Sequence, residues 1–430
     1  MKRLFQGFLL IAGASVAQAQ EPQTAAGIVI AVPPLTSPDS GTKGNQMLQV
    51  GWEATQVIVA DLSHTREFAP LRTSRDDYYS YPEVTAPSFG KWRSAGAKVL
   101  VTGFVQGRSD GRLTFGCYVY DVEKGRELAR KGFVLTPGEW RRAAHKCSGL
   151  AYSAVVGVPG GFDSRIAYVA ETGTGDARLR RIAVMDSDGF NHRYLTAGGT
   201  MVLTPRLSPK ANRLAYVSFL DGKPSIRLLD LGSGQERALV PQDAISFAPR
   251  YSPDGSRIVF SMMVGSNCDI YIVGADGGAP QRLTTSPGVD TDPSFSPDGT
   301  KIVFESDRGG QQQLYVMNAD GSGERRITFG NGAYASPVWS PDGQWLAFTR
   351  HGPEGRRVGI VKPDGTGELL LTDGPADEGP SWAPNSRDIL FQRAGPGRSS
   401  LFHVALAGGA ARQMTIPQDG SDPDWSGVMD

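Results

Sequence analysis

The sequence is poor in cysteine and histidine, has no excess of either charge, and lacks long hydrophobic runs. Its 430 residues include three cysteines and five histidines, and 44 Lys and Arg balance 44 Asp and Glu. A chain without net charge has no whole-molecule field to attract nucleic acid or an anionic membrane, so we expect neither partner. Past the first twenty residues no apolar run approaches the ~20 residues of a transmembrane helix, so we expect no direct membrane insertion.

The few cysteines and histidines do not form a recognisable site. Cys117 and Cys147 lie in one region and could form a disulfide, but we favour three unpaired, buried thiols, with Cys268 as the third. No metal-binding spacing joins the histidines, which are His64, His145, His192, His351 and His403. No phosphate loop or dinucleotide fingerprint stands between a strand and a helix. The sequence therefore predicts no metal site and no cofactor.

Residues 1–19 have the composition of a secretory signal peptide. The positive pair Lys2 and Arg3 precedes a short apolar run, and Ala17-Gln18-Ala19 fits a small-x-small cleavage site. We expect cleavage between Ala19 and Gln20 and export of the mature chain. An N-terminal membrane anchor is the alternative, which the shortness of the apolar run disfavours.

Glycine and proline are abundant and recur with a fixed period. The run Pro249-Arg250-Tyr251-Ser252-Pro253-Asp254-Gly255 leads into an apolar strand. Its matches, at intervals of 43 or 44 residues, begin at Pro205, Pro293, Pro337, Pro380 and Pro423. Each repeat offers four short apolar runs separated by Asp-Gly and similar turn residues, which is typical of a β-propeller blade. We interpret the Ser-Pro-Asp-Gly element as a tight turn between the first two strands.

The two ends of the repeat region predict how the ring closes. The last repeat, at Pro423-Asp424-Trp425-Ser426, offers a single strand. Conversely, Arg165-Ile166-Ala167-Tyr168-Val169 begins a set of three strands without a first one. We therefore expect a six-bladed β-propeller over residues 162–430, closed by the C-terminal strand so that no sheet edge stays open.

Residues 20–157 lack the repeat and mix helical and strand periodicities. Strand candidates cover residues 28–32, 98–106, 113–121 and 128–135, and apolar residues recur at helical spacing from Met47 to Leu62. Thr136-Pro137-Gly138-Glu139 is a capping box that predicts a second helix. This order indicates a small α/β domain, which a glycine-containing hinge at residues 158–161 joins to the ring.

Catalytic motifs are weak. Gly107-Arg108-Ser109-Asp110-Gly111 matches the hydrolase pattern G-x-S-x-G, but it leads into a strand where a nucleophile elbow needs a helix. Asp186-Ser187-Asp188-Gly189 resembles the start of a calcium loop without the later ligands, and we interpret it as a turn. We expect no enzyme. The alternative is a periplasmic hydrolase or lyase that acts on peptide or glycan in the channel.

Acidic residues gather in six loops that we expect at one end of the propeller channel. These mouth loops each lead into the first strand of a blade and cover residues 197–204, 241–248, 285–292, 330–336, 373–379 and 417–422. They contain no Lys or Arg, and their acids are Asp243, Asp290, Asp292, Asp373, Asp377, Glu378, Asp419 and Asp422. We expect a negative channel mouth that docks a cationic or amide-donating segment or holds a cation; ordinary solvated loop acids are the alternative.

Together these features resemble the TolB family, the periplasmic soluble component of the Tol-Pal envelope system of Gram-negative bacteria. The resemblance rests on the signal peptide, Phe68-Ala69-Pro70-Leu71, the junction at Arg165 to Val169 and the propeller repeat. The repeat alone is shared with relatives of prolyl oligopeptidase. The resemblance implies a periplasmic, monomeric, non-enzymatic protein that binds the lipoprotein Pal and supports outer-membrane integrity and envelope constriction during division.

The resemblance also implies contact residues. It places contacts with Pal at Ile245, Ala248 and Thr291, with Ile245 where the family often has a polar residue or histidine. The other mouth residues that we expect to contact Pal are Asp290, Asp292, Ser336, Asp377, Glu378 and Asp422. For the inner-membrane protein TolA, the resemblance implies contacts with the N-terminus, at Gln20, Glu21, Ala25 and Gly27. Only eight residues separate the cleavage site from the first expected strand.

Overall fold

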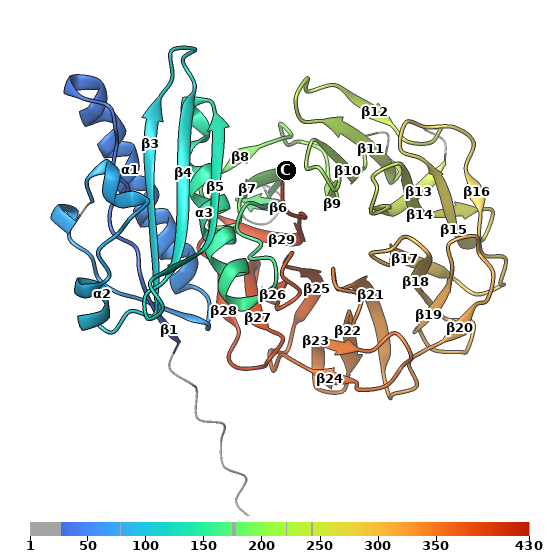
Figure 1. Cartoon of the computed structure of the whole chain (residues 1–430). Coiled ribbons are helices and arrows are strands. Elements are labelled where there is room, and N and C mark those ends of the chain that lie inside the picture. Colours follow the sequence, from blue (N-terminus) through green and yellow to red (C-terminus); the bar gives the residue numbers. More distant parts are fainter. Residues whose placement is uncertain (1–26, 78, 174–177, 221, 242–243, 430) are drawn as a thin grey trace, which may run out of the picture.

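The structure is a computed structural model that describes residues 27–429 except 78, 174–177, 221 and 242–243. The described residues form an N-terminal domain with a mixed sheet and a ring of six four-stranded sheets (Figure 1). This confirms the predicted fold class, an α/β domain followed by a six-bladed β-propeller. The expected signal peptide and cleavage site lie outside the described residues. Within the described part, no helix is both long and apolar enough to cross a membrane.

The N-terminal domain is a five-stranded sheet between two helical layers. Its strands are β1 (Ile28–Ala31), β2 (Phe68–Pro70), β3 (Val99–Gly107), β4 (Leu113–Asp121) and β5 (Arg126–Leu135), in the order β2-β1-β3-β4-β5. Strand β1 runs parallel to its two neighbours, and the remaining pairs are antiparallel. The helices are α1 (Gly41–Ser63), α2 (Gly90–Ser94) and α3 (Trp140–Val156). Helices α1 and α3 share one core with the sheet, and α2 covers the opposite face.

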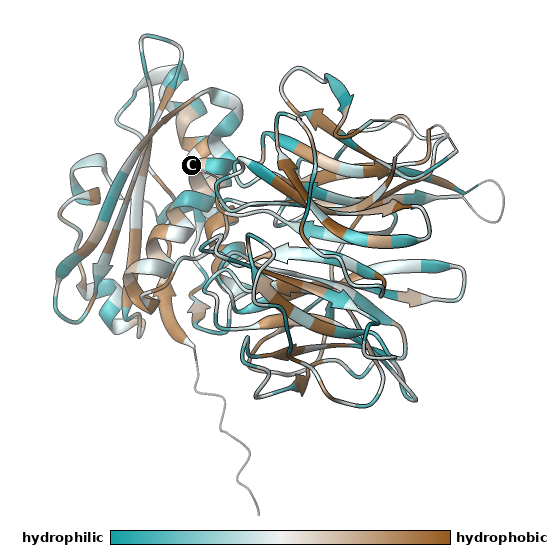
Figure 2. Ribbon diagram, turned by 90° about the vertical axis from the view of Figure 1, so that its right-hand side faces the viewer, coloured by the Kyte–Doolittle hydropathy of each residue, from teal (hydrophilic) through white to brown (hydrophobic). Residues whose placement is uncertain are grey.

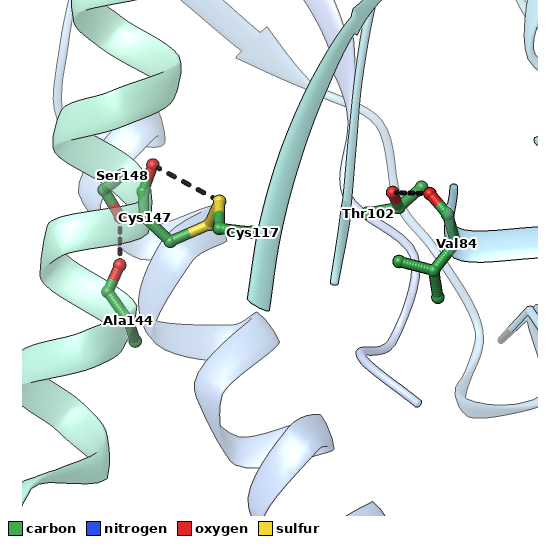
Figure 3. Close-up of a disulfide and its surroundings, with 6 residues drawn as sticks. All are labelled: Val84, Thr102, Cys117, Ala144, Cys147 and Ser148. Atoms are coloured by element: carbon green, nitrogen blue, oxygen red, sulfur yellow. Dashed lines mark hydrogen bonds between the residues drawn. A yellow bond between two sulfur atoms is a disulfide. The ribbon is translucent and has the colours of Figure 1, made fainter. Parts of the chain in front are cut away.

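A disulfide joins the sheet to helix α3. Cys117 on β4 and Cys147 on α3 are bonded, with their Cα atoms 5.8 Å apart (Figure 3). The expectation that we favoured, three unpaired thiols, is therefore wrong for these two residues. The capping box and the strand place them on facing surfaces of one core, and sequence separation alone does not reveal this. Cys268 is unpaired and buried, as expected.

Six sheets of four strands make the propeller. In order from the channel outward, the strands are β9 (Val202–Leu207), β10 (Arg213–Ser218), β11 (Ser225–Asp230) and β12 (Glu236–Ala238); β13 (Ile245–Tyr251), β14 (Arg257–Val264), β15 (Asn267–Gly274) and β16 (Gln281–Arg282); β17 (Asp290–Phe295), β18 (Lys301–Ser306), β19 (Gln313–Asn318) and β20 (Arg325–Arg326); β21 (Ala333–Trp339), β22 (Leu346–Gly352), β23 (Gly355–Val361) and β24 (Leu369–Leu370); β25 (Asp377–Trp382), β26 (Asp388–Gly395), β27 (Arg398–Ala405) and β28 (Arg412–Gln413); and β29 (Asp419–Trp425), β6 (Arg165–Thr172), β7 (Leu179–Asp186) and β8 (Arg193–Tyr194). The last of these sheets combines one strand from the C-terminus with three from the start of the ring, so its pairing closes the circle.

The hydrophobic cores of the propeller lie between neighbouring blades. Each of six clusters of buried residues combines side chains from two adjacent sheets. The equivalent aromatic residues Phe260, Phe304, Phe348 and Phe391 are fully buried in four successive blades. Truncating such a ring costs about 3–5 kcal/mol. Figure 2 shows hydrophobic residues along the propeller strands. Because each blade buries its faces only against its neighbours, the ring depends on closure.

The repeat turns connect the first two strands of each blade. Asp254 accepts hydrogen bonds from Ser252 Oγ and from the N–H of Ser256, and these bonds lower the pKa of its carboxyl group. Gly255 follows with φ of 73°, a conformation that disfavours side chains. Ala211 takes the corresponding place in another blade, with φ of 50°. The aspartates therefore act on their own turns.

The N-terminal domain contacts the turns of two blades, at the opposite end of the strands from the mouth loops. Figure 1 shows it beside the sheets that contain β28 and β8. Asp163 accepts from Arg142 at 3.2 Å and forms an ion pair with Lys146 at 3.3 Å, both from α3. Glu67 and Arg387 pair at 2.5 Å across the domains. A cavity of about 790 Å³ lies beside these contacts. We call this surface of the propeller the interdomain face.

Candidate functional site

A ring of six residues with positive φ marks one end of the propeller channel. The first strand of every blade is interrupted by a β-bulge, where a residue directly before a proline adopts positive φ. This bulge ring consists of Thr204 (46°), Ala248 (51°), Asp292 (49°), Ser336 (51°), Gly379 (66°) and Asp422 (49°). Glycine alone adopts such φ values without strain, and the others cost about 1–2 kcal/mol each. Strained residues and bulges gather where a fold serves a function, so we take this end as the candidate site.

A second ring of side chains holds most of the bulges in place. These residues lie on the second strand of each blade and are Val169, Val217, Ser261, Glu305, Thr349 and Gln392. The N–H of Asp292 donates to Ser261 Oγ at 3.2 Å, and that of Gly379 donates to Thr349 Oγ1 at 3.1 Å. Glu305 and Gln392 accept in the same way from the next blades. The bulges are therefore built from contacts between neighbouring blades.

Glu305 is a buried carboxyl group at this site. Its two oxygens accept hydrogen bonds from Thr291 Oγ1 and from the N–H of Ser336 at 3.3 Å. Burial and the nearby carboxylate of Asp292 raise the pKa of Glu305 to about 8, so it holds a proton at neutral pH. Ser336 Oγ also donates to Asp292 at 3.2 Å. The predicted residues Thr291, Asp292 and Ser336 thus lie together around a residue that the sequence analysis missed.

Two arginines share one aspartate inside the channel. Arg250 Nη1 contacts Asp424 Oδ1 at 3.0 Å, and Arg206 Nε lies 3.9 Å from the same atom. The other oxygen of Asp424 accepts from the N–H of Leu207 at 2.8 Å. Burial and the positive charge of Arg206 lower the pKa of Arg250 to about 9. Sequence reasoning missed all three because it searched the mouth loops, whereas these residues follow the repeated prolines on the strands.

The mouth is less negative than the sequence predicted. Asp290 and Asp377 are fully buried, and they pair with Arg308 at 2.7 Å and with Arg393 at 2.6 Å. Glu378 likewise lies 2.9 Å from an arginine, Arg356. The expectation of an acid-only surface is therefore wrong for these three acids, because strands and turns next to the loops supply the cations. Asp373 is exposed and lies 3.9 Å from Arg393, and Asp243 lies outside the described residues.

The remaining predicted residues fall in different places. Ile245 is half-buried at the start of β13, whereas Ala248 is buried in the bulge of the same strand. Burial raises the pKa of Asp422, which accepts a hydrogen bond from the N–H of Thr204 at 3.3 Å. Gly27 precedes β1 and packs closely on the backbone of Phe68, within the N-terminal sheet. Gln20, Glu21 and Ala25 lie outside the described residues.

Exposed hydrophobic residues surround part of the mouth. They lie in or next to the mouth loops, and in or next to the hairpins between the second and third strands of blades. Since strands alternate in direction, these loops and hairpins share one face. We call this set the apolar rim, and it consists of Leu179, Met201, Leu220, Met263, Val264, Val289 and Phe329. Phe329 is 73% exposed. Such a gathering of large apolar side chains is typical of a protein-binding surface, and no motif in the sequence marks it.

One further cluster of titratable residues lies at the interdomain face. His145 Nδ1 is 2.9 Å from Asp61, and its Nε2 is 3.5 Å from Asp188. The three residues bring one ligand-type atom each within 4.8 Å of one another. Arg141 also donates to Asp188, and its positive charge opposes a metal ion there. We therefore assign the group as an ion-pair network between the domains.

Comparisons with known proteins agree with this architecture. Two family models match the chain, described as the TolB beta propeller domain over residues 152–429 and the TolB amino-terminal domain over residues 21–128. Relatives named Tol-Pal system protein TolB include that of Zymomonas mobilis, 51% identical over 212 residues, and that of Rhizorhabdus wittichii, 49% identical over 195 residues. The matched segments cover 49% and 45% of this chain. They span 46% and 44% of those relatives, about half of their length.

Solved structures show the same fold. The crystal structure of TolB from Acinetobacter baumannii is similar with a TM-score of 0.76 and 25% identity, and the similarity covers 93% of this chain and 96% of that one. The structure of a putative TolB from Agrobacterium tumefaciens is similar with a TM-score of 0.50 and 21% identity, over 60% of this chain and 90% of that one. The second similarity concerns the fold alone.

Proposed function

The chain belongs to the TolB family, and from this premise we propose that it is a non-catalytic periplasmic protein that docks the lipoprotein Pal at its channel mouth. Docking there couples Pal to the inner-membrane Tol complex and supports outer-membrane integrity and envelope constriction during division. The Tol-Pal names of its relatives support membership of that system. The assignment of Pal and of the contact surface is the proposal.

The observation that carries this proposal is the apolar rim around the bulge ring. A monomeric protein rarely exposes many large apolar side chains on one face unless a partner covers them. Here Leu220, Val264 and Phe329 stand around a mouth whose backbone is held in strained conformations. Apolar side chains beside preorganised polar groups are the usual composition of a protein-binding hot spot.

The engaged state of Glu305 supports a binding role over catalysis. A general acid or base needs a carboxyl oxygen that can reach a substrate. Both oxygens of Glu305 already accept hydrogen bonds, from Thr291 and from Ser336, and the side chain is buried. Its pKa is raised by its burial and by the nearby carboxylate of Asp292. The alternative of a periplasmic hydrolase or lyase therefore gains no support from this carboxyl group.

The proposal extends to the N-terminus. We propose that Gln20, Glu21, Ala25 and Gly27 contribute to contacts with TolA. The short distance between the expected cleavage site and β1 limits this segment to a few residues. A peptide of residues 20–27 that binds the periplasmic part of TolA in a titration would support this part, and a peptide that does not bind would contradict it.

The main test is a calorimetric titration of the mature chain with the periplasmic domain of Pal from the same organism. We expect saturable binding, weakened about tenfold or more by Phe329→Ser and by Val264→Ser, because each change removes an apolar anchor. Val134→Ser is the matched control, since Val134 is similarly exposed on β5 of the N-terminal domain. The control should bind like the unmodified chain.

Two results would contradict the proposal. Absence of binding by the unmodified chain removes Pal as the partner. Binding that is unchanged in both rim variants, in proteins with unchanged thermal unfolding, moves the interface away from the channel mouth.

A further inference from the structure

His145 connects three elements at the interdomain face. It lies on α3 and is 2% exposed. Asp61 reaches it from α1, and Asp188 reaches it from the propeller turn that follows β7. Asp61 and His145 belong to the N-terminal domain, whereas Asp188 belongs to the ring. The histidine therefore lies between two carboxylates, one from each domain.

The geometry at the ring nitrogens favours the doubly protonated form of His145. Nδ1 is 2.9 Å from Asp61 Oδ2, while Nε2 is 3.5 Å from Asp188 Oδ2. Nε2 is buried and has no hydrogen-bond partner within the described part of the chain. A neutral imidazole carries a single N–H, so it would turn a lone pair toward one of the carboxylates. The imidazolium ion presents an N–H to each, and a small shift of Asp188 completes the second bond.

The surrounding charges balance only with that proton. Asp61 and Asp188 are negative, and Arg141, from the same helix as His145, donates to Asp188. Asp186, in the same turn region, accepts from Asn191 at 2.6 Å and adds negative potential. Burial opposes the charge on His145, but the attraction of Asp61, Asp188 and Asp186 outweighs it, and the pKa of His145 is raised. With the proton, one histidine and one arginine neutralise the two contacting aspartates.

We propose that His145 is a pH-dependent latch between the two domains. In the latched state its imidazolium bridges Asp61 and Asp188. Loss of the proton turns a lone pair toward Asp188 and loosens the turn after β7, because Arg141 then holds Asp188 to helix α3 without the second contact from His145. Asp61 and Asp188 also line the interdomain cavity of about 790 Å³, so release widens that cavity.

The direction of the pH dependence follows from the raised pKa. The latch contributes fully below the pKa of a free histidine, about 6.5. It weakens as pH rises from there and is lost above the pKa of the latched state. Between these two values the ratio of released to latched molecules rises about tenfold per pH unit. Arg141 keeps its contact with Asp188, and Arg142 and Lys146 keep theirs with Asp163, so release is a local opening and not a separation of the domains.

The first test follows the histidines of the unmodified mature chain by NMR across pH 5 to 9. We expect the imidazole of His145 to titrate above 6.5, and its signal is identified by its absence in His145→Gln. His403 is the internal comparison, because it also lines the cavity but burial lowers its pKa. A His145 that titrates below 6.5 in the unmodified chain overturns the proposal whatever the variants do.

The second test measures opening directly, by hydrogen–deuterium exchange of the turn at residues 186–190 between pH 6 and 8.5. After correction for the intrinsic pH dependence of exchange, we expect faster exchange of this turn at high pH. His145→Gln should abolish that pH dependence, and the matched control His403→Gln should retain it. Exchange that is independent of pH, or equally dependent in His145→Gln, overturns the latch.

Discussion

The two faces of the propeller pair most of their buried acids with cations, and they differ at one buried acid, Glu305 of the channel mouth. At the interdomain face, Asp163 contacts two cations, Arg142 and Lys146, and Asp188 contacts Arg141 and His145. At the channel mouth, Asp290 and Asp377 likewise pair with arginines. Glu305, in contrast, has no cation within ion-pair distance in the described part of the chain and keeps a proton. Glu305 is satisfied by hydrogen bonds and not by a counter-charge, because its two oxygens accept from Thr291 and Ser336.

The two faces also differ in which residue types adopt positive φ. At the interdomain face, positive φ occurs mostly at glycines of the repeat turns, such as Gly255 and Gly299. At the mouth, five of the six bulge residues are not glycine. Strain of about 1–2 kcal/mol per residue is therefore kept in the bulge ring. On the proposed function, this strain holds the mouth in a defined binding geometry.

Removing the ion pairs of Asp163 at the interdomain face should lower the stability of the protein more than the other changes. Asp163→Ala removes the carboxylate that Arg142 and Lys146 share, and Asp163 is only 3% exposed. We expect a loss of roughly 2–3 kcal/mol in the free energy of unfolding, below the 3–5 kcal/mol of fully buried pairs because both cations are partly exposed. Denaturant unfolding provides the measurement. The control Asp276→Ala removes an exposed partner of Arg213 and should change little.

Glu305→Gln should stabilise the protein in a pH-dependent way. The folded pKa of about 8 lies above the unfolded value of about 4.5, so the carboxyl group costs stability as pH rises between them. The variant should match the unmodified chain near pH 4 and exceed it in stability by a margin that grows as pH rises to 8. Thermal unfolding across this range checks it. The reverse change at the equivalent position, Gln392→Glu, should lower the stability of the protein more at pH 8 than at pH 4. If the stability change of each variant is the same at both pH values, the raised pKa of Glu305 is refuted.

Two substitutions by glycine should change stability least, and they should separate the two faces by their effect on Pal binding. Ala211 in a repeat turn and Ala248 in the bulge ring both have φ near 50°. Replacing either with glycine relieves strain but adds flexibility to the unfolded chain, for a net gain of about 0.5 kcal/mol. Only Ala248→Gly should also weaken Pal binding, by a few-fold, because it loosens the mouth. Equal binding by the two variants would remove the functional distinction between the faces.

The propeller was predictable because its repeat is a local signal. Each turn is set by residues within one run, as at Ser252 to Gly255, and each blade buries its residues against adjacent repeats. The single strand at Pro423 and the unpaired set at Arg165 made closure visible as well. The α/β domain followed from its own periodicities and from the capping box at Thr136.

The candidate site was predictable in position but not in composition. The mouth loops led to Asp292, Ser336 and Asp422, which do lie in the bulge ring. Glu305 and Arg250 were missed because they lie on strands, where nothing in a single repeat marks them. The position of Ser261 and Thr349 in the repeat could have pointed to Glu305, had the blades been aligned strand by strand.

By itself the sequence determined the number of blades and the order of the domains, because each blade is marked by residues close together in the chain. It also determined how the ring closes, because the incomplete repeats at the two ends complement each other. The tertiary structure alone decided which charges are compensated and which thiols are bonded. Arg250 meets Asp424 across 174 residues, Arg387 meets Glu67 across 320, and Cys117 meets Cys147 only when β4 lies against α3. Electrostatic and covalent contacts depend on distance in space, and folding sets that distance.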